Sequence, residues 1–351
     1  MSQQFEFQSP FPVPPERLFD WHAQPGAFGR LVPPWQRATL GAPAPELVDG
    51  SRLQFGLRKG PFVFKWLAEH SDVEPGRRFV DSQVKGPFRS WRHAHEFVPR
   101  EAGASSLLDR IEYELPLGSL GQLVAGKSIQ RDLNRTFRYR HEVLGQDLKL
   151  HEAYGDRPRL RVAITGASGL IGSALADLLT TGGHEVLRLS RTSKRGDEIE
   201  WDPGRGVLDV KALEGVDAVV HLAGENVGGR RWTVRQMERI RSSRIAGTRW
   251  LVDALRQLEQ RPRSFISASA VGFYGDRGTE RLNEDSSPGT GFLADVCSAW
   301  EAEALAAGET AGMRVALARF GVVLSPRGGA LAKMLPPFRL GAGGRLGSGR
   351  Q

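Results

Sequence analysis

Cysteine is almost absent from this sequence, which contains one, Cys297, among 351 residues. A single cysteine excludes an intramolecular disulfide and a cysteine-based zinc site. It also fits a reducing compartment, where disulfides do not persist. We therefore expect a cytoplasmic protein.

Long apolar runs are absent as well. The sequence has no run of about 18 apolar residues of the kind that crosses a membrane, and its first residues lack the basic-then-apolar pattern of a secretion signal. Hydrophobic residues make up 40% of the chain and charged residues 25%, which is typical of folded rather than disordered proteins. We expect a folded, soluble protein with no membrane partner.

An acidic excess is also missing: 48 Lys and Arg outnumber 40 Asp and Glu, and the net charge is +8. Such a charge suits nucleic acid or an anionic ligand. The excess is nearly all arginine, however, and is scattered through segments with helical apolar spacing, such as 135–140, 230–231 and 239–241. We interpret most of these arginines as solvated helix faces, keep phosphate binding by some of them as the alternative, and expect no nucleic-acid partner.

The length of the chain indicates two domains, because one domain typically holds about 100 to 200 residues. Residues 1–150 are predicted to be mostly strands, since apolar and polar residues alternate, for example at 62–67 and 111–115. A short N-terminal helix and a long helix over about 127–144 bracket this predicted antiparallel sheet. A curved sheet around a long helix would leave a cavity suited to an apolar ligand.

Two motifs in this half, 85–93 and 109–113, together with the order of strands and the long final helix, carry a resemblance. Residues 1–150 resemble the START-like (SRPBCC) helix-grip domains, which implies an α+β fold and an apolar ligand. His93 and His95 alternate along one strand, and we interpret them as one face of that strand. No carboxylate or third histidine stands at ligand spacing nearby in the sequence, so we expect no metal site.

The stretch 148–159 is polar, contains Gly155 and Pro158 and has no clear period, which indicates a domain boundary. We expect a linker over 151–159 and a second domain over 160–351. Strand and helix alternate after the boundary, as is typical of a parallel sheet covered on both faces. The predicted fold is therefore an α/β, Rossmann-like doubly wound parallel sheet, preceded by the α+β helix-grip domain.

A glycine-rich turn opens the second half. The run 160–165 predicts a strand, the turn follows, and an amphipathic helix continues to about residue 181. In this context Gly166 permits the tight turn, Gly169 lets the backbone approach a pyrophosphate, and Gly172 lets the helix pack closely on the strand. Phosphates would meet free N–H groups and the positive end of the helix dipole. The predicted cofactor-binding residues here are Gly166, Ser168, Gly169, Leu170, Ile171 and Gly172.

The residues after the next predicted strand, 185–189, select the cofactor. A site selective for NAD usually places an acidic residue about 20 residues past the glycines, on the ribose 2′-hydroxyl, whereas an arginine there accommodates a 2′-phosphate. This position is basic, because Ser190, Arg191 and Arg195 follow the strand. We therefore predict NADP(H) as the cofactor, with Arg191 as the principal phosphate ligand and Ser190 or Arg195 assisting.

A further strand, predicted at 217–222, leads into small residues that let the chain pass close to the nicotinamide half of a cofactor. The predicted contacts are Leu222, Ala223, Gly224 and Glu225. Two alternatives stay open. In the first, Ala223 and Gly224 end a strand without contacting a ligand. In the second, Glu225 and Asn226 cap the following helix instead of holding a substrate or a positioned water.

Six motifs in this half carry a second resemblance. They lie at 221–226, 231–233, 240–244, 267–276, 297–301 and 334–341. Residues 160–351 resemble the atypical extended short-chain dehydrogenases of the epimerase-family, or sugar-nucleotide-epimerase-like, branch, some members of which carry a START-like domain in front. The resemblance implies an NADP(H)-binding oxidoreductase or epimerase-like protein that acts on a small molecule, for which a nucleotide sugar is the candidate.

The catalytic residues of the wider superfamily are incomplete in this sequence. Its members use a serine at the end of the fifth strand and a Tyr-x-x-x-Lys pair on the next helix, where lysine lowers the pKa of the tyrosine that moves the proton. Ser269 matches the serine, but Leu293 and Cys297 stand where the pair would be. Tyr274 is the candidate substitute, and a purely structural tyrosine is the alternative. The alternative function is therefore an NADPH-binding sensor, or a protein that binds an apolar ligand, without turnover.

The chain ends within a glycine-rich loop, 341–349, where the resembled proteins continue into a substrate-covering lobe. The nucleotide-binding strands are expected to be complete, because the last of them is predicted at 315–324. We therefore expect a truncated chain that lacks the C-terminal substrate lobe.

Overall fold

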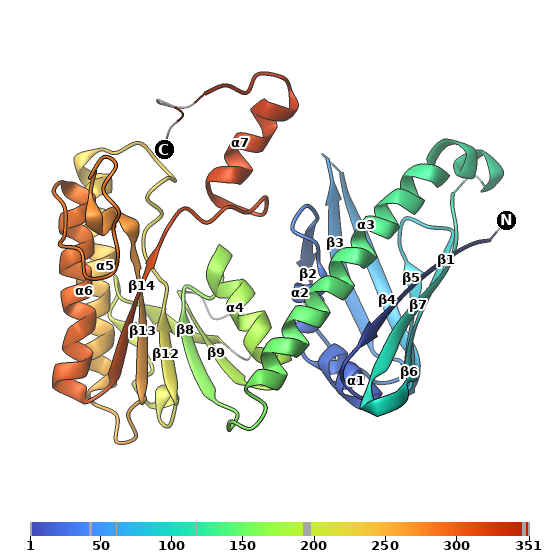
Figure 1. Ribbon diagram of the computed structural model, residues 1–351, viewed down its shortest axis with the longest axis horizontal. Coiled ribbons are helices and arrows are strands. Elements are labelled where there is room, and N and C mark those ends of the chain that lie inside the picture. Colours follow the sequence, from blue (N-terminus) through green and yellow to red (C-terminus); the bar gives the residue numbers. More distant parts are fainter. Residues whose placement is uncertain are drawn as a thin grey trace. The chain divides into compact units, whose positions relative to one another are not determined.

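The computed structural model describes residues 2–41, 44–60, 62–116, 118–191, 198–345 and 349. The chain forms two compact units, one of residues 1–158 with 177–183 and one of residues 159–176 with 184–351. Each unit contains one seven-stranded sheet (Figure 1). None of the helices in the described ranges is both long and apolar enough to span a membrane.

The sheet of the first unit is antiparallel throughout. Its strands lie in the order β1, β7, β6, β5, β4, β3, β2. Their bounds are β1 (Gln3–Phe11), β2 (Arg37–Leu40), β3 (Arg52–Lys59), β4 (Phe62–Glu74), β5 (Arg78–Lys85), β6 (Ser90–Pro99) and β7 (Ser105–Glu114). Buried and partly exposed residues alternate along most of β7, so one face of the sheet is turned to the core.

Three α-helices accompany this sheet. They are α1 (Pro15–Ala23), α2 (Ala27–Leu31) and α3 (Gly118–Ala153), and a 3-10 turn, Glu101–Gly103, joins β6 to β7. Helix α1 begins with a proline at its first position, where the missing N–H leaves no hydrogen bond unmade. The long helix α3 lies along the sheet and contacts β1 (Figure 1). The predicted α+β helix-grip fold is confirmed.

Helix α3 is longer than its predicted range of about 127–144. Glycines near its start weaken the helix signal in the sequence, because glycine is a poor helix former. Gly145 resembles a helix stop, yet Leu148 continues the buried face and the helix runs to Ala153. The first three residues of the predicted linker 151–159 are therefore helical.

Two apolar clusters fill the space between the sheet and its helices. One includes Phe11, Leu18, Phe19, Phe79, Phe97, Leu107 and Leu144, and the other includes Phe5, Ile111, Tyr113 and Phe137. Buried histidines contact both clusters. The ring of His93 packs edge-on against Phe137 with 5.3 Å between centroids, and the ring of His95 stacks on Phe79 at 4.1 Å. The interior of this unit is thus mostly apolar and aromatic, with polar histidine side chains buried in it.

The sheet of the second unit has the strand order β11, β10, β9, β8, β12, β13, β14. All neighbours are parallel except β10 and β11. The bounds are β8 (Arg161–Thr165), β9 (Glu185–Ser190), β10 (Glu198–Asp202), β11 (Val207–Leu208), β12 (Ala218–His221), β13 (Ser264–Ala270) and β14 (Arg314–Phe320). This order confirms the predicted Rossmann-like doubly wound sheet.

Helices alternate with these strands. They are α4 (Leu170–Thr181), α5 (Val234–Leu255), α6 (Phe292–Ala311) and α7 (Gly329–Arg339), with 3-10 turns at Val210–Leu213 (η2) and Val271–Tyr274 (η3). Helices α5 and α6 pack side by side (Figure 1). Strands are added on one side of β8 as far as β11, and the chain then returns to place β12 on the other side. The carboxyl ends of β8 and β12 therefore form the topological switch point, where ligands bind in open α/β sheets.

Candidate cofactor site and its surroundings

The glycine-rich turn occupies the switch point. Gly166 has a φ of 68°, in the left-handed region, and a Cβ added there would lie 3.0 Å from the backbone of Leu222 and Ala223. A Cβ on Gly172 would lie 2.3 Å from the carbonyl oxygen of Gly166. Both positions exclude a side chain. The first turn of α4 consequently lies directly on the turn that precedes it.

The outer part of the turn faces solvent. Ser168 and Gly169 are exposed, and Leu170 and Ile171 at the start of α4 are half-buried. The N–H of Gly169 donates to the carbonyl of Gly166 at 2.9 Å. An exposed turn at the amino end of a helix has the electrostatics of an anion site, because the helix dipole is positive there.

Thr165, the last residue of β8, joins the two strand ends. Its hydroxyl oxygen accepts the N–H of Leu222 at 3.1 Å and that of Ala223 at 3.2 Å, and lies 2.7 Å from Nδ1 of His221. A hydroxyl that accepts twice has its one proton left to donate, so Nδ1 of His221 is the acceptor and its Nε2 donates to Thr248 at 2.9 Å. Burial, aided by the charge of Arg244, lowers the pKa of His221 to about 4. The imidazole is therefore neutral, and its hydrogen bonds to Thr165 and Thr248 help to hold the strand ends in place.

The residues predicted to select the cofactor lie at the end of β9. Ser190 is the last residue of that strand and is half-buried, and Arg191 follows it and is exposed. The third predicted residue, Arg195, lies outside the described residues. Since β9 is the neighbour of β8, Arg191 leaves the sheet at the same edge as the glycine turn.

Side chains of α5 hold the segment that follows β12. A Cβ on Gly224 would lie 3.1 Å from the guanidinium carbon of Arg244, whose Nη1 donates to the carbonyl of Glu225 at 3.0 Å. The N–H of Glu225 donates to the hydroxyl of Ser243 at 3.0 Å, and its carboxylate accepts from Gln236 at 3.1 Å. The close approach at Gly224 is therefore to an arginine of the protein.

The helix-cap interpretation of Glu225 and Asn226 is wrong. Thr233 caps α5, because its hydroxyl accepts the N–H of Gln236 at 3.2 Å. Asn226 instead closes a local turn, in which its side-chain oxygen accepts the N–H of Gly228 at 2.9 Å. Because the segment between β12 and α5 is long, the sequence alone does not show which polar residue caps the helix.

Ser269 and Tyr274 belong to one buried hydrogen-bond network. Ser269, at the end of β13, is 2% exposed and donates its hydroxyl proton to the carboxylate of Glu301 at 2.5 Å. Arg319 of β14 binds both oxygens of Glu301, each at 2.8 Å, and donates to the phenol oxygen of Tyr274 at 3.0 Å. The hydrogen bond to Glu301 raises the pKa of Arg319 further above its usual range. The structure thus brings both predicted residues together through two residues that the sequence reasoning missed.

Glu301 and Arg319 left only a weak signal in the sequence. Glu301 is an acidic residue on the buried face of α6, next to Trp300, and Arg319 is a charge inside a parallel strand. Either feature predicts a buried ion pair, but the partners are far apart in the chain. Cys297, one helical turn before Glu301, is buried, and burial raises the pKa of its thiol.

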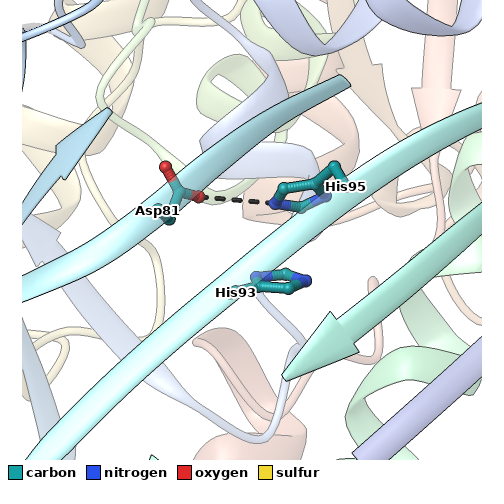
Figure 2. Close-up of side chains that lie close together, drawn as sticks. All are labelled: Asp81, His93 and His95. Carbon is teal, nitrogen blue, oxygen red and sulfur yellow. Dashed lines mark hydrogen bonds and ion pairs between the residues drawn. The ribbon is translucent and has the colours of Figure 1, made fainter. Parts of the chain in front are cut away.

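His93 and His95 lie on one face of β6, as the alternation predicts. We expected no carboxylate near them that could act as a metal ligand, and in the folded structure this expectation is wrong. Asp81 on β5 is paired with His93 across the sheet, and its carboxylate oxygen lies 3.4 Å from Nε2 of His95 (Figure 2). Antiparallel pairing thus brings together residues that sequence spacing separates.

Comparison with known proteins agrees with both halves. Residues 162–343, just over half of the chain, match the NAD dependent epimerase/dehydratase family. The chain belongs to this family. Residues 11–142 match a second family, described as polyketide cyclase / dehydrase and lipid transport. The two predicted resemblances are confirmed, and membership of the first family makes the second unit an NAD(P)-binding Rossmann domain.

Relatives of the family domain come from distant organisms. Epimerase family protein Mb2239 of Mycobacterium bovis is 47% identical over 191 residues, which cover 54% of this chain and 62% of that protein. Human epimerase family protein SDR39U1 is 38% identical over 195 residues, which cover 55% of this chain and 64% of that protein. The chain thus spans less than two thirds of the length of these curated relatives.

One solved structure matches both units. It is described as the nucleoside-diphosphate sugar epimerase from Corynebacterium glutamicum, and it superposes with a TM-score of 0.81 at 36% sequence identity. The match covers 98% of this chain and 71% of that protein. The combination of a helix-grip unit and an epimerase-family unit therefore recurs in a relative.

Proposed function

We propose that the second unit binds NADP(H), with the pyrophosphate over the exposed turn at Ser168 and Gly169 and the adenosine 2′-phosphate on Arg191. Ser190 or Arg195 assists, and Leu222 to Glu225 flank the nicotinamide half. The observation that carries the proposal is the glycine turn at the switch point with a basic residue at the end of the adjacent strand. An acidic residue would be expected there for NAD.

We propose further that the protein is an oxidoreductase or epimerase-like enzyme that acts on a nucleotide sugar. The description of the Corynebacterium relative supports this substrate class. NADP(H), when bound, supplies hydride chemistry at its nicotinamide. Proton movement would fall to Ser269 or Tyr274, because Leu293 and Cys297 occupy the positions of the usual tyrosine and lysine.

A specific observation favours a second candidate, an NADPH-binding protein without turnover. The hydroxyl of Ser269 is used by Glu301 and that of Tyr274 is bonded to Arg319, and both residues are less than 10% exposed. A group that moves a proton must be within hydrogen-bond reach of the substrate. Buried hydroxyls with protein partners fit a structural network.

For the first unit we propose an apolar small-molecule ligand. A groove of about 470 Å³ runs between β1 and α3, where Phe7, Pro10 and Phe11 face Arg138 and Glu142. The β1 side of the groove is mostly apolar, as is typical of small-molecule sites, whereas its α3 side also carries His141, Gln146 and Lys149. We also propose a helix-grip domain over 1–150, a linker over 151–159 whose first three residues are the end of α3, and a Rossmann domain over 160–351, in a cytoplasmic protein.

Cofactor binding and turnover are tested separately. NADPH and NADH are titrated into the full chain and followed by nicotinamide fluorescence, first with wild type and then with Arg191→Glu. We expect NADPH to bind more tightly than NADH, and the variant to lose that preference. Equal affinities in wild type would refute the cofactor assignment.

For turnover, the protein is incubated with NADP and a panel of nucleotide sugars, and reduced nicotinamide and epimerised product are measured. Activity that Ser269→Ala abolishes supports the enzyme. Tight NADPH binding with no turnover across the panel supports the second candidate.

A further inference from the structure

Histidines are concentrated in the interior of the first unit. Five of the eight histidines of the chain lie there with two aspartates: His22, His70, His93, His95, His141, Asp81 and Asp109. They come from α1, four adjacent strands and α3. Burying polar groups without partners is unfavourable, so a group of this size inside an aromatic core calls for a specific role.

Three of these residues lie close enough together to share a metal ion. His93 and His95 are two residues apart on β6 and point to the same side, and Asp81 approaches them from β5 (Figure 2). One donor atom from each of the three lies within 4.8 Å of the other two. Ligands that share a tetrahedral zinc ion at about 2.1 Å are about 3.4 Å apart. That is the separation of His95 Nε2 and Asp81 Oδ2, 3.4 Å.

Asp109 orients both imidazoles from the opposite side. One of its oxygens lies 2.8 Å from Nε2 of His93 and 2.8 Å from Nδ1 of His95. Its other oxygen lies 2.6 Å from Nε2 of His141. Nδ1 of His93 and Nε2 of His95 are then left for an ion, in the arrangement where a carboxylate holds the far nitrogen of a metal-binding histidine.

Asp81 is supported in the same way. Its second oxygen lies 2.5 Å from Nδ1 of His70, a contact that restrains the carboxylate. The side chain of Asp81 is 26% exposed, whereas those of His93, His95 and Asp109 are each below 8%. An ion can therefore reach the site from solvent along Asp81, while the two histidines and Asp109 are shielded from water.

We propose that Asp81, His93 and His95 bind a late first-row divalent metal ion of the zinc type, with Asp109 as the positioning carboxylate. Imidazole and carboxylate donors suit zinc, and three protein ligands leave a fourth position for water. The charges of Asp81 and Asp109 together balance a dication. In the described residues Nδ1 of His95 makes no aligned hydrogen bond, although Asp109 is 2.8 Å away. A small rotation of the ring toward an ion at Nε2 would align it.

The test uses untagged, full-length protein stripped with a chelator. Zinc is titrated by calorimetry, and cobalt is added as a spectroscopic probe whose visible absorption reports tetrahedral coordination. We expect one ion per chain and a rise in Tm on zinc addition, since an ion that binds only the folded state stabilises it. Asp81→Asn should abolish this binding, and Asp109→Asn should weaken it about 10- to 100-fold, as for other positioning carboxylates.

Asp72→Asn is the matched control. It removes an exposed carboxylate of the same sheet, whose partner is Arg92 at 3.3 Å, and should leave zinc affinity unchanged. Circular dichroism establishes that each variant is folded, and Asp81→Asn is the milder change because Asp81 is partly exposed. The proposal is overturned if wild type shows no saturable binding of one zinc ion per chain. It is equally overturned if folded Asp81→Asn binds zinc as tightly as wild type.

Discussion

Two helical glycines of the second unit provide a test of the site geometry. Gly172 is the third residue of α4 and Gly247 lies in the middle of α5. Replacing an interior helical glycine by alanine usually stabilises a protein by about 0.5–1 kcal/mol. If propensity alone mattered, both substitutions would raise the free energy of unfolding.

The surroundings of the two glycines predict opposite signs. At Gly247 the nearest atom to an added Cβ is in the ring of Pro203 at 4.0 Å, which is an ordinary contact. At Gly172 the Cβ would lie 2.3 Å from the oxygen of Gly166 and 2.9 Å from Cα of Ala167, and both are backbone atoms. Relieving this clash requires α4 and the turn to separate by about 1 Å. Overpacking of this kind destabilises by roughly 1–3 kcal/mol, which exceeds the propensity gain.

Urea unfolding of the two variants measures these changes. We expect Gly247→Ala to gain stability and Gly172→Ala to lose it, with at least a tenfold loss of NADPH affinity for Gly172→Ala because the N–H groups of the turn move with it. A Gly172→Ala protein that is as stable as Gly247→Ala would contradict the packing of α4 on the turn. Unchanged NADPH affinity in a destabilised Gly172→Ala protein would separate the turn from the cofactor site.

Three further predictions concern the second unit. Arg191→Glu should weaken NADPH binding at least tenfold with little effect on NADH, because a carboxylate would repel the 2′-phosphate, and nicotinamide fluorescence measures both constants. Glu301→Gln should lower the free energy of unfolding by about 3 kcal/mol in a denaturant titration, because it leaves the half-buried Arg319 without its carboxylate partner. Glu303→Gln is the control: its partner Arg249 is exposed, so the loss should be less than about 1 kcal/mol. Because burial raises the pKa of Cys297, a smaller fraction of this thiol is ionised at pH 8 than of a free thiol. Iodoacetamide at pH 8 should therefore label Cys297 at least tenfold more slowly than it labels glutathione. A rate equal to that of glutathione would place the thiol at the surface.

What the sequence predicted well depends on residues close together in the chain. The glycine turn is complete within residues 165–172, so its strand, turn and helix context could be recognised without any long-range pairing. The polarity of the residue after β9 is equally local, and Arg191 lies where the sequence placed it. The extent of α3 was harder, because Gly145 suggests a stop that the packing of Leu148 overrides.

What the sequence could not predict are partnerships made by the sheets. Asp81 meets His95 only because β5 and β6 are antiparallel in one particular register, and a shift of one residue would turn the carboxylate to the other face. Glu301 meets Arg319 only because α6 packs against β14. In both cases the chemistry of each residue was visible in the sequence, and its partner was not.

The network around Glu301 also sets a condition on catalysis. The sequence resemblance aligns Leu293 and Cys297 of α6 with the tyrosine and lysine of the wider superfamily, and a Cβ on Gly272 would lie 3.3 Å from Leu293. The polar group that reaches Ser269 comes one turn later, from Glu301, and Arg319 donates to both oxygens of that carboxylate. Ser269 therefore donates its proton to Glu301 and has none to offer a substrate. Turnover through Ser269 requires the pair of Glu301 and Arg319 to rearrange, so an enzyme that used this serine should gain rather than lose activity when Glu301→Gln weakens the pair.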